Sequence, residues 1–308
     1  MNNIVQRGAY LALLTALVSG VSIFVNSFGV KQVSDPFVYT TAKNLLVGLA
    51  LAALVVLPMV WRELRGFSAR QWIALLGLGL IGGSLPFLLF FYGLREATAP
   101  SAAFIHKTLF IWVAILAVPL LKEQLGRIQI LALAVLVIGN LVLLGRPAAW
   151  DLGTAELLIF VATLLWAAEA VLARRLMRDI STTAAALGRM GFGSLAMLAF
   201  LAASERVDSL VGLDANQWGW VLLTSVFLLA YVGSYYSALK RAPATLVASV
   251  LVLGSVVTSL LHAVFSGRTY TLEQVAGFGF ILLAVVLWLY VGRKTSSIAT
   301  PEVVHVRR

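Results

Sequence analysis

The fold is decided by the stretch FYGLREATAPSAAFIHKTLF, Phe91 to Phe110, which joins two apolar segments and is repeated later in the chain. Moved by 145 residues, it aligns with YSALKRAPATLVASV, Tyr236 to Val250. The identical pairs under this shift are Leu94 with Leu239, Ala97 with Ala242, Ala99 with Ala244, Ala103 with Ala248 and, further on, Gln129 with Gln274. One constant shift that holds over two segments and a loop is typical of a duplicated membrane unit.

The composition is that of an integral membrane protein. The 308 residues are 61% apolar and 12% charged, and the mean hydropathy is +0.96, whereas soluble proteins carry about 25% charged residues. The formal net charge of +10 does not indicate nucleic-acid binding, because the basic residues are scattered between apolar segments. The absence of cysteine excludes disulfides and cysteine-ligated metals.

Ten apolar segments can be marked, and a membrane span needs about 20 such residues. The segments are 8–30, 37–60, 71–92, 99–121, 128–145, 153–173, 183–203, 216–239, 244–266 and 274–292. The first is too long for a signal-peptide core and lacks a convincing cleavage site, so we expect an uncleaved span. Almost all links are short, which leaves no room for a soluble domain and places the function within or across the membrane.

The distribution of basic residues predicts the topology, because Lys and Arg in short loops stay cytoplasmic. With the N-terminus inside, 15 basic residues fall on inner links, 5 on outer links and 3 of the 23 within spans. Both termini are therefore expected in the cytoplasm. The predicted fold is an all-α membrane protein of ten helices, built as two inverted five-helix repeats at 8–145 and 153–292, with a cytoplasmic basic tail at 293–308. Inverted repeats commonly enclose a solute site near the midplane.

Polar side chains inside spans are the first candidates for that site, because ionisable groups are costly in lipid and usually face a cavity or a partner. They are Lys43, His106, Lys107, Glu169, Arg189 and His262. Five of these six are basic or can become so. A cavity with this bias favours anionic or zwitterionic solutes over bulky cations.

The strongest pair is His106 and Lys107, about eight residues into the fourth span and so roughly 12 Å deep. Lys107 is predicted to hold a carboxylate, and His106 to donate a hydrogen bond or carry a proton. The alternative is that Lys107 extends to the interface while His106 is a packing residue. Lys43 and Arg189 occupy matching places in the second and seventh spans, and the same alternative applies to them.

Glu169 lies near the predicted inner end of the sixth span, close to Arg174 and Arg175. Two interpretations remain open for its carboxylate. It forms a structural ion pair with one of these arginines, or it couples or binds the solute.

Aromatic residues in the spans are candidate walls for a flat solute. They are Tyr92, Trp112, Trp166, Tyr231 and Tyr235. Tyr231 and Tyr235 share one helical face at i, i+4, as Trp166 and Glu169 do at i, i+3. Packing against lipid or core is the alternative for each of them. The small residues Gly79 with Gly83, and Gly188 near Gly191 and Gly193, predict close helix approach.

The chain resembles the drug/metabolite transporter superfamily, in the branch with two EamA domains. The resemblance rests on YGLREATAPSAAF and YYSALKRAPATLVAS and on LKEQLGRIQ, Leu121 to Gln129, with Glu123 at the acidic place of the family. It covers residues 8–292. In the second half Arg268 stands at the acidic place, and Ser19-Gly20 replaces a frequent Trp-Gly pair. Within this family the chain is similar to YddG-type exporters, which implies export of aromatic amino acids across the inner (plasma) membrane.

The sequence thus predicts a secondary transporter that exports small organic solutes, aromatic amino acids first, by alternating access. A carrier of other anionic metabolites or nucleotide sugars is an alternative, and a channel or a membrane-embedded enzyme is an alternative from another class. The chain lacks a G-x-x-x-x-G-K-[ST] loop and an H-E-x-x-H motif. No enzymatic activity, metal or cofactor is predicted. The expected partners are a small, amino acid-like solute and membrane lipid, with no nucleic acid. The oligomeric state is left open, and a monomer is compatible with the sequence.

Overall fold

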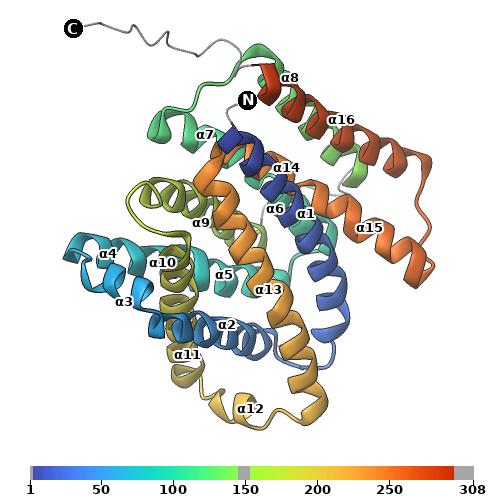
Figure 1. Ribbon diagram of the computed structural model, residues 1–308. Helices are drawn as coiled ribbons and strands as arrows, with labels where there is room; N and C mark the ends of the chain where they lie inside the picture. The colour runs from blue at the N-terminus through green and yellow to red at the C-terminus, as the bar shows by residue number, and fades with distance from the viewer. Residues whose placement is uncertain (1–2, 145–152, 295–308) are drawn as a thin grey trace, which may run out of the picture.

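The computed structural model describes residues 3–144 and 153–294, in which every regular element is a helix (Figure 1). The predicted outer link between the fifth and sixth spans and nearly all of the predicted basic tail lie outside these residues. In chain order the elements are α1 (Asn3–Gly29), α2 (Pro36–Ala53), η1 (Leu54–Val56), α3 (Pro58–Arg65), α4 (Ala69–Leu78), η2 (Gly79–Ser84), α5 (Leu85–Leu94), α6 (Ala99–Lys107), α7 (Leu109–Leu121), α8 (Arg127–Leu144), α9 (Thr154–Leu176), α10 (Thr182–Leu187), η3 (Gly188–Phe192), α11 (Gly193–Ala203), α12 (Val207–Val211), α13 (Ala215–Arg241), α14 (Ala244–Leu251), α15 (Leu253–Ser266) and α16 (Leu272–Lys294).

Nine helical segments of the described chain are long and apolar enough to cross a membrane. They are Asn3–Gly29, Pro36–Val56, Ala69–Leu94, Ser101–Leu121, Thr154–Leu176, Thr182–Ala203, Ala215–Arg241, Ala244–Ser266 and Leu272–Tyr290. The remaining predicted span corresponds to a shorter apolar helix, Arg127–Leu143. The fold class of an all-helical membrane protein is confirmed, and the count of ten spans stays a prediction.

The predicted second span is too long at its end. The apolar helix stops at Val56, and a separate amphipathic helix, α3, begins at Pro58. Proline lacks the amide hydrogen that would continue the preceding helix but is well tolerated in the first turn of a new one. The last residues of the predicted 37–60 segment, from Pro58 to Val60, therefore belong to a separate amphipathic helix.

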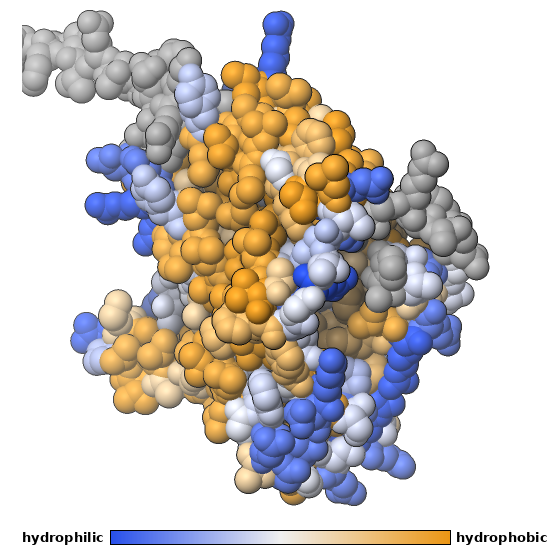
Figure 2. All heavy atoms as spheres, turned by 90° about the vertical axis from the view of Figure 1, so that its right-hand side faces the viewer, coloured by the Kyte–Doolittle hydropathy of each residue, from blue (hydrophilic) through white to orange (hydrophobic). Residues whose placement is uncertain are grey.

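The surface carries the apolar belt that a membrane requires. Figure 2 shows hydrophobic side chains in a broad band across one face, with hydrophilic side chains gathered mainly beyond its margins. Many large apolar residues in the helices are exposed, among them Leu49, Ile73, Leu195, Leu222 and Val286. In water such a surface would aggregate, but against lipid tails it is the favourable one.

Two predicted spans are each broken near the middle. The segment α6–α7 is interrupted at Thr108, and α14–α15 is interrupted at Val252. At both breaks a hydroxyl donates to a backbone carbonyl three residues earlier, from Thr108 to Ile105 at 2.6 Å and from Ser255 to Val252 at 2.8 Å. The breaks agree with the 145-residue shift to within one residue, and each is confined to one residue whose backbone stays in the right-handed helical region.

Glycines bring two other helices into backbone contact, as their spacing predicts. The wide turns η2 and η3 pack against each other. A Cβ atom on Gly193 would lie 2.7 Å from Cα of Gly83 and 3.0 Å from the carbonyl oxygen of Gly79. Only residues without a side chain permit this approach, so the prediction of close packing is confirmed for Gly79, Gly83 and Gly193. It is wrong for Gly191, where an added Cβ atom would meet only a side-chain carbon of Leu187 at 3.9 Å.

At one end of the molecule, carboxylates of the first half of the chain cap helices of the second half. Glu63 accepts from the amide of Ser181 at 2.6 Å. Glu123 accepts from the amides of Ala244 at 2.6 Å and Thr245 at 3.1 Å, and from the Thr245 hydroxyl at 2.7 Å. These groups satisfy the free amides at the starts of α10 and α14. The links predicted to be cytoplasmic therefore meet at one end.

We expect Glu123→Ala to destabilise the protein, because it removes three hydrogen bonds to one carboxylate and leaves two helix-start amides without that acceptor. Loss of such a cap costs about 1–2 kcal/mol. Thermal unfolding in detergent measures the effect, with Glu96→Ala as the control, since Glu96 is exposed and its carboxylate has no hydrogen bond or ion pair within the described chain. Equal melting temperatures for the two variants would contradict the capping role.

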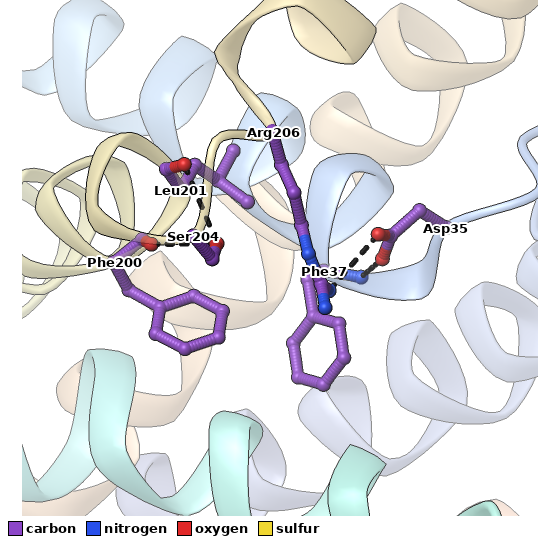
Figure 3. A network of polar contacts seen from close by, with 6 residues as sticks. All are labelled: Asp35, Phe37, Phe200, Leu201, Ser204 and Arg206. Atoms are coloured by element: carbon purple, nitrogen blue, oxygen red, sulfur yellow. Dashed lines mark hydrogen bonds and ion pairs between the residues drawn. The ribbon is translucent and has the colours of Figure 1, made fainter.

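The opposite end is tied by an ion pair. Arg206, in the link between α11 and α12, donates to Asp35 at 3.0 Å, and Asp35 also accepts from the amide of Phe37 at 2.8 Å (Figure 3). The guanidinium lies 5.1 Å from the centre of the Phe37 ring. The paired side chains are about a quarter exposed, at 25% and 23%, so the pair contributes about 0–1 kcal/mol. It ties the two halves with little stabilisation.

Candidate functional site

A cavity of about 310 Å³ lies between helices of both halves of the chain. It is lined by side chains from α5, the α6–α7 segment, α9, η3, α13 and α14. Its polar and aromatic lining residues are Phe87, Phe90, Phe91, His106, Trp166, Glu169, Arg189, Tyr231 and Tyr235. The structure thus brings together six of the ten predicted site residues in one place.

Glu169 is the acidic group of the cavity and is 2% exposed. Its carboxylate accepts a hydrogen bond of 2.6 Å from the hydroxyl of Tyr236. The ion pair considered with Arg174 or Arg175 is absent, and Arg174 instead donates to the carbonyl of Leu239 at 2.5 Å. Residues five and six positions further along a helix point to other faces than Glu169 does. The carboxylate is therefore left to the cavity.

Arg189 is the basic group of the same cavity and is 6% exposed. Its position in η3 turns the side chain into the protein, so that Nη2 donates to the carbonyl of Gly82 at 3.3 Å. Nε and Nη1 are buried and have no hydrogen-bond partner in the described chain. Arg189 therefore does not extend to the membrane interface, which was the alternative predicted for it. Two buried, unused donors on one guanidinium leave an unmet demand for an acceptor.

The two charges share one cavity without a direct ion pair between them. Both side chains pack on Gly82, where a Cβ atom would lie 3.2 Å from the carboxyl carbon of Glu169 and 3.4 Å from Nε of Arg189. Opposite charges in a low-dielectric site compensate each other over several ångströms. This part of the cavity therefore has a net charge close to zero, and it presents both a negative and a positive group to a ligand.

Aromatic rings form the walls beside these charges. The ring of Trp166 lies 4.9 Å from that of His106, 5.2 Å from that of Phe87 and 5.7 Å from that of Phe90. Tyr231 and Tyr235 stack with 5.5 Å between centroids and 10° between planes. Such flat faces suit an aromatic or planar solute.

A smaller chamber of about 180 Å³ adjoins the cavity and shares His106 and Tyr231 with it. It lies at the two helix breaks, because Lys107 from the first break and Val252 from the second both line it. The hydroxyl-bearing residues of its wall are Ser19, Tyr231 and Ser255. Lys107 is therefore near His106 but faces a different space from Glu169 and Arg189.

Three predicted site residues lie outside the lining of both spaces. Lys43 donates to Oδ1 of Asn26 at 2.6 Å and lies 4.7 Å from the Tyr39 ring. Tyr92 packs against Phe37, Phe200 and Arg95 near the Asp35–Arg206 pair. Trp112 donates to the Thr108 hydroxyl at 3.0 Å and packs on Phe160. Their roles in solute binding stay predictions.

The sequence reasoning missed some residues of the cavity. Tyr236 holds Glu169, and the Gly82 carbonyl holds Arg189. Phe87 and Phe90 flank Trp166. The 145-residue shift that pairs Phe91 with Tyr236 was a signal for the tyrosine, whereas a backbone carbonyl carries no signal in the sequence.

An EamA-like transporter family model matches residues 6–145 and 153–290, nearly the whole chain. The chain belongs to the EamA-like transporter family. Its apolar helices and family membership make it a multi-pass membrane protein that transports small solutes. The two matched segments correspond to the two halves whose helices meet around the cavity.

Relatives of this EamA-like transporter have transporter names without a stated solute. It is 24% identical to the "Uncharacterized transporter YyaM" of Bacillus subtilis (strain 168) over 246 residues, which cover 77% of this chain and 80% of the relative. It is 28% identical over 138 residues, 45% of this chain, to the "Uncharacterized transporter in cobO 3'region" of Sinorhizobium sp, of which 96% is covered. A solved crystal structure superposes with a TM-score of 0.72 at 17% identity, over 92% of this chain and 99% of the other, which supports the fold.

Proposed function

We propose that this EamA-like transporter is a secondary carrier that exports amino acids, aromatic ones first, across the inner (plasma) membrane. The single observation that carries the proposal is the lining of the main cavity. It presents a buried carboxylate, a buried guanidinium with two unused donors, and flat aromatic walls. A zwitterion with an aromatic side chain has the complementary groups.

Each group has an assigned role. The carboxylate of the solute accepts from the donors of Arg189 that the described chain leaves unused, since a guanidinium is well suited to a buried carboxylate. The ammonium donates to Glu169, and the side chain lies against Trp166. A cavity of about 310 Å³ is of the size of sites for small organic ligands.

The transport cycle in this proposal is alternating access by ten spans in two inverted repeats. The helix breaks near Thr108 and Val252, at a spacing close to the shift found in the sequence, support it. So do the two separate sets of contacts at opposite ends, Glu123 with α14 and Arg206 with Asp35. Opening toward one side requires release of one set while the other stays closed. Both termini lie in the cytoplasm in this arrangement.

The test is counterflow in sealed proteoliposomes that contain the purified protein. We expect saturable uptake of labelled tryptophan and phenylalanine that exceeds uptake of alanine and is competed by unlabelled aromatic amino acids. Absence of counterflow for every amino acid would refute this substrate class and would direct attention to other anionic metabolites. Uptake that does not saturate would instead indicate a channel.

We expect Trp166→Ala to raise the KM for tryptophan about 10-fold, since aromatic contacts contribute roughly 0.5–1.5 kcal/mol beyond their buried area. The KM for alanine should change much less. Trp112→Ala is the matched control, because Trp112 lies in a neighbouring helix but outside the cavity lining. Equal effects of the two substitutions on the KM for tryptophan would argue against an aromatic subsite at Trp166.

A further inference from the structure

The smaller chamber at the helix breaks contains a cation without a counter-charge. Lys107 lines it, and none of the residues that line it is acidic. No hydrogen bond or ion pair joins the Lys107 ammonium to another described residue. Its basic neighbour His106 adds no negative charge.

Glu169, the acidic residue of the main cavity, does not provide the counter-charge for Lys107. Glu169 accepts from Tyr236 and shares its cavity with Arg189, which is buried and permanently positively charged. One carboxylate compensates one guanidinium. The positive charge of Lys107 remains, and an isolated ammonium at membrane depth is costly unless an anion accompanies it.

Lys43, the other lysine within the predicted spans, differs in its surroundings. Its ammonium donates to the Asn26 amide oxygen at 2.6 Å and lies over the Tyr39 ring at 4.7 Å. These contacts give it a hydrogen-bond acceptor and the negative face of an aromatic ring. Lys107 has instead a chamber with hydroxyl groups from Ser19 and Tyr231 on its wall.

We infer that the Lys107 chamber is a binding site for a small inorganic anion of the halide type, separate from the solute site. A volume of about 180 Å³ admits a halide with a few waters, each water taking about 30 Å³. The Lys107 ammonium supplies the charge, and the hydroxyls of Ser19 and Tyr231 supply neutral donors. Because the chamber is built by both helix breaks, a bound anion links the α6–α7 and α14–α15 segments.

This inference does not depend on the identity of the solute. If the solute is a zwitterion, the need for a separate anion beside Lys107 is greater. A solute with no net charge leaves Lys107 uncompensated whether or not it is bound. The alternative anion for Lys107 is the carboxylate of the solute itself. If the solute carboxylate binds Lys107, chloride and solute compete for the same site, whereas a separate halide site leads to no such competition.

The first measurement is thermal unfolding of the purified protein without solute, in sodium chloride against sodium gluconate at constant ionic strength. We expect chloride to raise the melting temperature saturably by a few degrees, because a ligand that binds the native state stabilises it. The shift should be lost in Lys107→Met and kept in Lys107→Arg and in the matched control Lys43→Met. No chloride-specific shift in the wild type, or the same shift in Lys107→Met, would overturn the inference.

The second measurement separates the halide from the solute carboxylate. Tryptophan binding is titrated at several chloride concentrations, and we expect its Kd to stay constant or to fall as chloride rises. A Kd that rises in proportion to chloride in the wild type, and not in Lys107→Met, would assign Lys107 to the solute carboxylate and would overturn a separate site. Failure of the protein to bind any amino acid would refute the proposed solute and leave the first measurement unaffected.

Discussion

Replacing Arg189 with methionine is expected to reduce counterflow of aromatic amino acids at least about 100-fold. The substitution removes two donors that have no other partner in the described chain, and hydrogen bonds to charged groups contribute about 1.5–3 kcal/mol each. It also leaves Glu169 as an uncompensated buried carboxylate, and breaking such a buried charge arrangement costs about 3–5 kcal/mol. The measurement is initial counterflow rate in proteoliposomes with matched protein content.

A milder variant distinguishes binding from folding. Arg189→Lys keeps the charge but loses the planar, fixed array of guanidinium donors, so we expect a protein that unfolds at nearly the wild-type temperature and has a KM raised about 10-fold or more. In the wild type, tryptophan should compete much better than tryptamine, which lacks the carboxylate, and Arg189→Lys should narrow this difference. If Arg189→Lys transports as the wild type and keeps the full preference, Arg189 does not bind the carboxylate.

Replacing Gly193 with alanine is expected to destabilise the protein and to lower its yield as a folded monodisperse species. The new methyl group would lie 2.7 Å from Cα and 2.9 Å from the carbonyl carbon of Gly83. Both are backbone atoms that cannot rotate away, so η2 and η3 must separate. Overpacking of this kind costs about 1–3 kcal/mol, occasionally more. Thermal unfolding in detergent gives the size of the effect.

The control for this substitution lies two residues away in the same helical segment. At Gly191 an added methyl group would meet only a side-chain carbon of Leu187, at 3.9 Å, an ordinary contact. Alanine is favoured over glycine in helices by about 0.5–1 kcal/mol. Gly191→Ala should therefore match or exceed the wild-type melting temperature. Similar losses at both positions would show that the backbone contact with Gly83 is not what makes Gly193 sensitive.

Arg189 also sits where this close contact is made. It lies in η3, and its Nη2 donates to the carbonyl of Gly82 in η2. The glycine crossing therefore determines how far the guanidinium reaches into the cavity. A change of packing at Gly193 is expected to alter transport even where the folded protein is recovered.

The sequence by itself determined the class of the protein. Composition and the apolar segments were sufficient for an all-helical membrane protein, because lipid admits so few backbone arrangements. The resemblance carried by the Phe91–Phe110 stretch and its repeat pointed further, to the EamA-like transporters. The cost of ionisable groups in lipid also singled out six polar residues, of which three line the main cavity. Glu169, Arg189 and His106 were identified as candidates because ionisable groups persist in spans only where they have a cavity or a partner, and the cavity contains all three.

Only the tertiary structure decided which of these residues act together and which stand apart. Depth along a span does not fix the direction of a side chain. Lys43 and Arg189 occupy matching places in their spans, but Lys43 contacts Asn26 whereas Arg189 lines the cavity. Glu169 is near Arg174 in the chain, but its bond is to Tyr236, 67 residues away. The Gly82 carbonyl that holds Arg189 is backbone and has no signature in the sequence. Partnerships of this kind depend on helix rotation and on crossings between distant segments, which the order of residues along one helix does not specify.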